Sequence, residues 1–188
     1  MINGGFTLGG VPAKELGIIM IGTSKRPILP PTVDRTISIP GRNGAWDFGA
    51  DVGTRPFNLD CALIEQNAVA LQMAIERLAA LMVDRYGKPR TLELTFDTRP
   101  DRHYQVRYSG SLEIDRIIGL GRFTLPLVAF EPYAYGDERI TEQTITASPT
   151  VINIRSDGDI LTSPVIELTN NGTTTINQFT LSTEYQIE

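Results

Sequence analysis

The chain of 188 residues has few of the side chains that bind metals or cross-link a fold. It contains one cysteine, Cys61, and one histidine, His103. A single cysteine cannot form a disulfide within the chain, and one histidine with one cysteine cannot build a His/Cys zinc site. The residue counts therefore exclude a disulfide within the chain and a His/Cys zinc site. We expect the protein to work without a metal or other cofactor.

Long hydrophobic runs are also missing. The longest apolar stretches, at residues 17–22 and 78–83, are far shorter than the roughly 18 residues that span a bilayer. The first ten residues, MINGGFTLGG, lack the basic and then apolar pattern of a cleaved signal peptide. We therefore expect no membrane insertion, and a protein that stays in the cytoplasm or leaves it without a cleaved signal.

Positive charge is scarce and is not gathered into runs. Lysine and arginine number 17 against 22 acidic residues, which gives a net charge of −5. Tight binding of nucleic acid needs clustered basic side chains, so we do not expect it. With 41% hydrophobic and 21% charged residues, the composition is that of a globular protein with one full domain and a smaller piece.

One segment has the periodicity of an amphipathic helix. Apolar side chains recur there at steps of three and four residues: Ala68, Leu71, Ile75, Leu78 and Met82. Asn67 is a suitable N-cap, and Gly87 followed by Pro89 supplies a C-terminal stop. The sequence predicts a helix over residues 67–86.

Strands with alternating apolar and polar residues lie on both sides of this helix. The pattern is clearest at residues 57–63, 92–96, 104–108 and 123–129. Alternation of this kind is typical of an antiparallel sheet with one wet face. The predicted fold class is α+β, mostly β: an antiparallel β-sandwich with one packed amphipathic helix and an extended arm, followed by a partial β-sandwich unit.

The partial unit is predicted from a change in composition near residue 139. Thr, Ser, Asn and Gly become frequent, and short β-like runs occur at 144–146, 151–154, 165–169 and 175–181. Four short strands in about 50 residues are few for an independent sandwich. We therefore expect a first domain over residues 1–136 and a smaller, incomplete β unit over residues 137–188.

The extended arm is the segment between Pro40 and Pro56. It is punctuated by glycines, it is too long for a tight hairpin, and it contains aromatic residues that a solvated loop does not need. These aromatics either fold back as a lid on their own sheet or pack against another subunit. The candidate subunit-interface residues are Pro40, Gly41, Arg42, Asn43, Gly44, Trp46 and Phe48.

No catalytic group of residues stands out. His103 lies near Asp97 and Asp101, which is compatible with a general base and an orienting carboxylate, but no nucleophile motif accompanies it. A histidine at the start of a strand explains the same residues more simply. Cys61 falls on the apolar face of its strand, where a buried thiol is expected. We do not expect an enzyme.

Several segments, taken in order, resemble a known family. They are an N-terminal GGF strand, Ile39–Gly44 before the arm, Phe96-Asp97 with Pro100–Tyr104, Phe123–Leu125, and Phe130–Tyr135. Over residues 5–136 this order is similar to the distal tail protein of long, non-contractile-tailed bacteriophages, a ring component of the siphophage tail tip. The same residues leave open a related adaptor protein of a phage-derived injection machine.

The resemblance implies a structural role in the virion. Members of the family form a hexameric ring at the far end of the tail tube and connect the tube to the tip and adsorption apparatus. The implied partners are the chain itself in a homo-hexamer, the tail tube protein, a tail-tip hub or tail-associated protein and the tape-measure protein. DNA would pass through the lumen without specific binding. The implied location is the virion tail tip, and the host cytoplasm during assembly.

In this setting residues 1–136 would be the ring-forming domain, and the arm would reach a neighbouring subunit. Relatives usually carry a C-terminal β-sandwich similar to galectins or carbohydrate-binding modules. The alternative function is therefore a carbohydrate-binding β-sandwich module that recognises the host surface. A glycan titration would support it if binding were saturable and lost on deleting residues 139–188.

Overall fold

The computed structural model describes residues 4–156, 158–160 and 162–184. The chain divides into two compact units, Met1–Glu142 and Gln143–Glu188. In the described part, no helix has the length and apolar character needed to cross a membrane.

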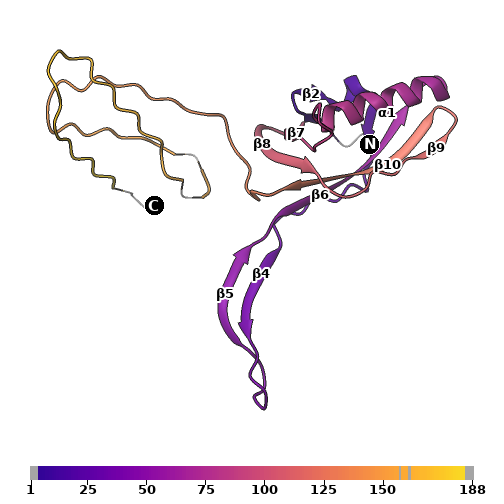
Figure 1. Ribbon diagram of the computed structural model, residues 1–188, viewed down its shortest axis with the longest axis horizontal. Coiled ribbons are helices and arrows are strands. Elements are labelled where there is room, and N and C mark those ends of the chain that lie inside the picture. The colour runs from indigo at the N-terminus through magenta and orange to yellow at the C-terminus, as the bar shows by residue number, and fades with distance from the viewer. Residues whose placement is uncertain (1–3, 157, 161, 185–188) are drawn as a thin grey trace. The chain divides into compact units, whose positions relative to one another are not determined.

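The first unit is built on one antiparallel sheet of eight strands (Figure 1). The strands are β1 (Phe6–Leu8), β2 (Val11–Pro12), β3 (Ile18–Met20), β6 (Arg55–Ile64), β7 (Thr91–Phe96), β8 (Arg99–Tyr108), β9 (Asp115–Ile117) and β10 (Leu120–Ala129). Their order is β2-β1-β7-β8-β10-β6-β3, and β9 pairs with β10. Among the described residues of this unit, a short 3-10 helix, η1 (Ala13–Leu16), and one α-helix, α1 (Ala68–Met82), accompany the sheet. The predicted α+β, mostly β class with one packed helix is confirmed.

The core lies between α1 and the sheet. It is formed by the apolar residues of the strands in which apolar and polar residues were predicted to alternate. On β6, Phe57, Leu59 and Leu63 are fully buried, whereas Asn58 and Asp60 lie on the wetter face. β10 runs antiparallel to β6 along its whole length and alternates in the same way. The helix adds its own apolar stripe, of which Leu71 and Leu78 are the largest buried side chains.

Helix α1 begins where the sequence predicted and ends earlier. Asn67 is its N-cap, and the side-chain Oδ1 accepts a hydrogen bond from the Ala70 N–H at 2.9 Å. The helix ends at Met82 rather than at residue 86, because Asp84 starts a turn. Its Oδ1 accepts hydrogen bonds from the N–H groups of Tyr86 and Lys88, and an aspartate that bonds the backbone in this way competes with helix.

The cap gives a first testable prediction. Replacing Asn67 with alanine removes the acceptor and should lower the free energy of unfolding by about 1 kcal/mol. Asn67→Ser retains a side-chain oxygen and should lose less than half of that. Urea unfolding followed by circular dichroism measures both variants. Equal losses in the two variants would show that the Asn67 side chain does not cap the helix.

A second, separate sheet forms the arm. It is a hairpin of two strands, β4 (Thr32–Ile37) and β5 (Trp46–Val52), joined by residues 38–45. The sequence predicted a single extended segment over residues 40–56, so the arm begins earlier than expected and is a hairpin. β4 was missed because it follows a proline-rich stretch and no tight-turn signal separates it from β5. A bulge interrupts the pairing near Gly49, whose φ of 91° suits glycine.

The second unit differs from the prediction. The four short strands expected at 144–146, 151–154, 165–169 and 175–181 do not form, because these described residues carry no strand hydrogen-bonding pattern. Their apolar side chains remain exposed; Val165, for example, is fully accessible. A segment this small buries too little surface to compensate for the ordering of strands.

Candidate functional site

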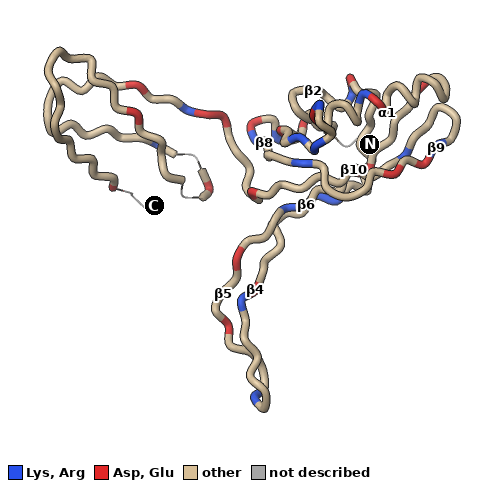
Figure 2. Tube along the Cα trace, in the orientation of Figure 1, with Lys and Arg blue, Asp and Glu red and all other residues tan. Residues whose placement is uncertain are grey.

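All seven predicted interface residues lie on the β4–β5 hairpin. Residues 40–44 form its tip, and Trp46 and Phe48 lie on β5 directly after it. The structure therefore brings together at one end of the arm the side chains that the sequence singled out. Arg42 is the one charged residue of the tip loop, residues 38–45 (Figure 2).

The tip is an ordered turn. The Arg42 N–H donates a hydrogen bond to the Ile39 carbonyl at 3.2 Å, and Gly41 and Gly44 both have a φ of 82°. The Arg42 guanidinium lies over the Trp46 ring, 4.1 Å from its centre. This cation–π contact holds a positive charge beside an aromatic face, and Trp and Arg are both enriched among the residues that dominate binding at interfaces.

The aromatic side chains of the hairpin are exposed. Trp46 is 50% and Phe48 is 65% accessible, and every residue of β4 and β5 is classed as exposed. They do not form a lid on the chain's own sheet, which was one of the two alternatives left by the sequence. Large exposed apolar side chains grouped on one element are typical of a binding surface.

The structure adds residues that the sequence did not single out. Ile37 pairs directly with Trp46 across the hairpin, and Ile39 lies in the tip loop; both are about half exposed. An ion pair between Arg35 and Asp51 ties the two strands together. The four β-branched residues of TVDRTI were the signal that could have identified β4.

The root of the hairpin is fixed to the main sheet by Arg55. Its Nη2 donates to the carbonyls of Pro27 and Ile28 at 2.7 and 2.8 Å, and its Nη1 donates to the Pro132 carbonyl at 3.2 Å. The guanidinium also lies 5.0 Å from the centre of the Tyr104 ring. The chain enters and leaves the hairpin at this anchored point.

His103 is not arranged as a general base. Its ring stacks on Tyr135 with centroids 5.8 Å apart, and the backbones of the two residues form a β-bridge. Asp101 lies 3.6 Å from the Arg102 guanidinium. Among the described residues, no hydrogen bond or ion pair connects His103 to Asp97 or Asp101. The structure thus does not bring this predicted group together.

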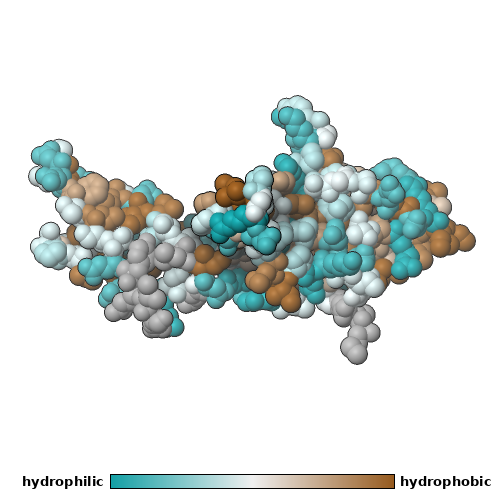
Figure 3. All heavy atoms as spheres, turned by 90° about the horizontal axis from the view of Figure 1, so that it is seen from below, coloured by the Kyte–Doolittle hydropathy of each residue, from teal (hydrophilic) through white to brown (hydrophobic). Residues whose placement is uncertain are grey.

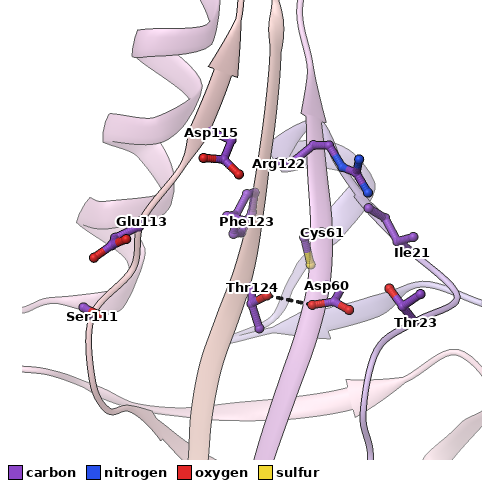
Figure 4. Close-up of a pocket in the computed structure, with 10 residues that line it drawn as sticks. All are labelled: Ile21, Thr23, Asp60, Cys61, Ser111, Glu113, Asp115, Arg122, Phe123 and Thr124. Carbon is purple, nitrogen blue, oxygen red and sulfur yellow. Dashed lines mark hydrogen bonds between the residues drawn. The ribbon is translucent and has the colours of Figure 1, made fainter.

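An open pocket of about 490 Å³ lies along β6, β10 and the segment before β9 (Figure 4). Asp60 is its best-fixed carboxylate, since Thr124 Oγ1 donates a hydrogen bond to it at 2.7 Å. Cys61 also lines the pocket, and burial raises the pKa of its thiol to about 12, so the thiol is unreactive at neutral pH. In the described part of the chain, no three His, Cys, Asp or Glu side chains are grouped to hold a metal ion.

Asp60 gives a prediction for pH dependence. Hydrogen bonds from Thr23 and Thr124 favour the carboxylate and lower the pKa of Asp60 below its ordinary value of 3.8. A lowered pKa stabilises the fold above pH 3.8, and this contribution is lost as the pH falls through the folded-state pKa. Wild type should therefore be more stable than Asp60→Asn at pH 6, and the difference should shrink at pH 3. A difference in urea midpoint that does not change with pH would contradict this assignment.

The comparisons with known proteins agree with this architecture. A sequence model of the phage tail protein RIFT-related domain matches residues 12–129. No curated protein matches the chain significantly. The fold is similar to that of the SPP1 phage protein Dit, whose crystal structure is described as a paradigm of the hub adsorption apparatus in phages that infect Gram-positive bacteria.

The likeness to SPP1 Dit has a TM-score of 0.60 at 18% sequence identity and covers 71% of this chain. The match spans 52% of the SPP1 protein, so this chain corresponds to about half of it. The family match confirms that the chain resembles phage tail proteins, as the sequence indicated, and the likeness to SPP1 Dit confirms the fold. The chain belongs to the family of phage tail proteins built on a RIFT-related domain, and is a structural protein of the virion tail.

Proposed function

We propose that six copies of this chain form a ring at the distal end of a siphophage tail tube. The ring would connect the tube to the tip and adsorption apparatus. The observation that carries the proposal is the β4–β5 hairpin, which presents exposed aromatic side chains on an anchored arm in a chain of a phage tail family. An arm of this kind has no use in an isolated subunit.

The hairpin suits contact between subunits for two physical reasons. Its tip is pre-ordered by a turn and a cation–π contact, so little conformational entropy is lost on binding. Its side chains are aromatic and arginine, the types that contribute most to binding free energy at interfaces. The contact would be head-to-tail, and a head-to-tail interface closes into a ring when its rotation is a whole fraction of a turn.

The remaining partners follow from the position in the tail. The ring would contact the tail tube protein on one side, and a tail-tip hub or tail-associated protein and the tape-measure protein on the other. Six copies would carry about −30 charges, which suits a channel that DNA crosses without binding. Assembly would begin in the host cytoplasm and end at the virion tail tip.

The test is the solution mass of the purified full chain by light scattering, followed by negative-stain imaging. We expect a species near six times 20.7 kDa with ring-shaped particles. If the protein alone is monomeric, the measurement is repeated after mixing with purified tail tubes, because ring closure depends on concentration and neighbouring rings. A monomer at high concentration that also fails to bind tubes would overturn the proposal.

The carbohydrate-binding alternative has less support. It was based on the β-rich composition after residue 139, and the described residues of that unit form no sheet that could present a sugar-binding face. Phe179, the aromatic residue described there, is 68% exposed and stands on an irregular segment. A titration with cell-wall glycans tests this alternative separately from ring formation.

A further inference from the structure

A second exposed apolar surface lies where β9 turns into β10, beside the first turns of α1. We call it the β9–α1 patch; it consists of Ile64, Val69, Met73, Ile117 and Ile118, each more than half exposed. Two hydrogen bonds hold the elements of the patch together: the Glu65 N–H donates to the Gly119 carbonyl at 2.8 Å, and Arg116 Nη1 donates to Gln72 Oε1 at 3.0 Å. The space-filling view shows apolar surface at the end of this unit where β9 lies (Figure 3).

The residue at the turn itself is unusual. Ile118 and Gly119 connect β9 to β10, and Ile118 has a φ of 54°, a conformation that is costly for a β-branched side chain. Glycine, asparagine or aspartate would fit this turn better. Packing requires a glycine at position 119, because a Cβ there would lie 2.2 Å from the Glu65 carbonyl oxygen. No such packing constraint selects isoleucine at position 118, whose side chain is 80% exposed. Folding therefore does not explain the isoleucine, whereas binding of an apolar partner does.

The hairpin and the patch lie at opposite ends of the same strand. β6 starts at Arg55, the root of the hairpin, and ends at Ile64, in the patch. A strand of this length spans about 30 Å, so the two surfaces are well separated within one chain. An interface that joins one end of a subunit to the other end of the next is head-to-tail, as a ring requires.

Opposite charges lie at the tip of the hairpin and beside the patch. Arg42 is the one charged residue of the hairpin tip. The segment leading to the patch carries the exposed carboxylates Glu113 and Asp115, whereas its one cation, Arg116, is hydrogen-bonded to Gln72. Opposite charges at the rim of an apolar contact fix its register and orientation.

From this placement we propose that the β9–α1 patch is the docking surface for the β4–β5 hairpin of a second copy of the chain. Ile37, Trp46 and Phe48 would cover the exposed isoleucines, and Arg42 would lie near Asp115. The inference rests on the proposed ring, and names the surface that completes it.

The decisive variant is Ile118→Asn, measured in the full chain. Asparagine tolerates the positive φ, so the melting temperature should stay the same or rise. Because an apolar anchor is lost, the subunit association constant should fall about tenfold or more, measured by light scattering over a dilution series. Val69→Ser, on a regular helical turn of the same patch, should weaken association as well. Unchanged association in both variants would overturn the proposal.

Cross-linking tests the contact directly. One sample carries Asn43→Cys at the hairpin tip and a second carries Asp115→Cys beside the patch; Cys61 is buried and does not interfere. Mixed under mild oxidation, they should form a disulfide-linked dimer, whereas Asn43→Cys mixed with Lys88→Cys should not. If wild type forms rings but neither test behaves as expected, the patch assignment is wrong and the ring stands. If wild type forms no ring with or without tail tubes, the proposed function itself fails.

Discussion

Replacing both Trp46 and Phe48 with alanine should abolish ring assembly and leave the fold of the subunit intact. Both side chains are at least half exposed and contact little of their own sheet, so the melting temperature should change by no more than about 2 °C. Truncating an aromatic anchor at an interface typically costs about 2 kcal/mol or more. Two anchors would lower the association constant by about a thousandfold.

Light scattering of the double variant and its thermal unfolding curve, measured on the same sample, check both parts of this prediction. Leu29→Ala is a control, because Leu29 is also an exposed apolar side chain, even more exposed than Trp46 and Phe48, but precedes the hairpin. It should assemble like wild type. If the double variant unfolds at low temperature or is insoluble, the aromatics support the fold of their own chain and the hairpin is not an interface element.

The sequence predicted the main sheet and its helix well because their burial is periodic. On β6 and α1 the buried residues recur at the spacing of a strand or helix, with Ala62 as the exception, and the pattern is independent of neighbouring segments. The N-cap at Asn67 was also correctly placed, since it depends on one side chain. The helix end was set four residues too late, because the turn made by Asp84 competes with the helix before Gly87 is reached.

The hairpin was only half predicted because it lacks a buried face. Both strands are exposed, so no hydrophobic alternation marks them, and a loop of eight residues separates them without a short turn signal. The sequence identified the arm by its residue types, because Trp46 and Phe48 among glycines have no role in a solvated loop. The docking patch was missed entirely, since the conflict at Ile118 is visible only in the backbone conformation.

Arg55 connects the hairpin to the main sheet. Its guanidinium bonds to backbone carbonyls at the root of the hairpin and to the segment that follows β10, while stacking near Tyr104. An arm that binds another subunit must be held in a fixed direction, because ordering it at the moment of binding would reduce the affinity. The exposed hairpin is thus pre-oriented by a side chain of the sheet that it leaves.

Replacing Leu78 with alanine should have the opposite effect from the hairpin variant. It should lower the free energy of unfolding, and assembly should be lost only because the subunit unfolds. Leu78 is 1% exposed and lies at the centre of the stripe that α1 presents to the sheet. Removing a buried leucine costs about 2 to 5 kcal/mol, which would lower the melting temperature by about 4 to 20 °C. Ile75, though part of the predicted apolar stripe, is only partly buried, so Ile75→Ala should cost less.

Met73 on the same helix provides the matched control, because it is 60% exposed and belongs to the β9–α1 patch. Met73→Ala should leave the urea midpoint nearly unchanged and weaken subunit association, whereas Leu78→Ala should shift the midpoint strongly. Helix α1 would then serve two surfaces, an inner one that forms the core and an outer one that receives a neighbouring hairpin. If both variants lower the urea midpoint equally, the outer face of the helix contributes to folding. Folding and assembly would then not depend on separate surfaces, as the ring proposal requires.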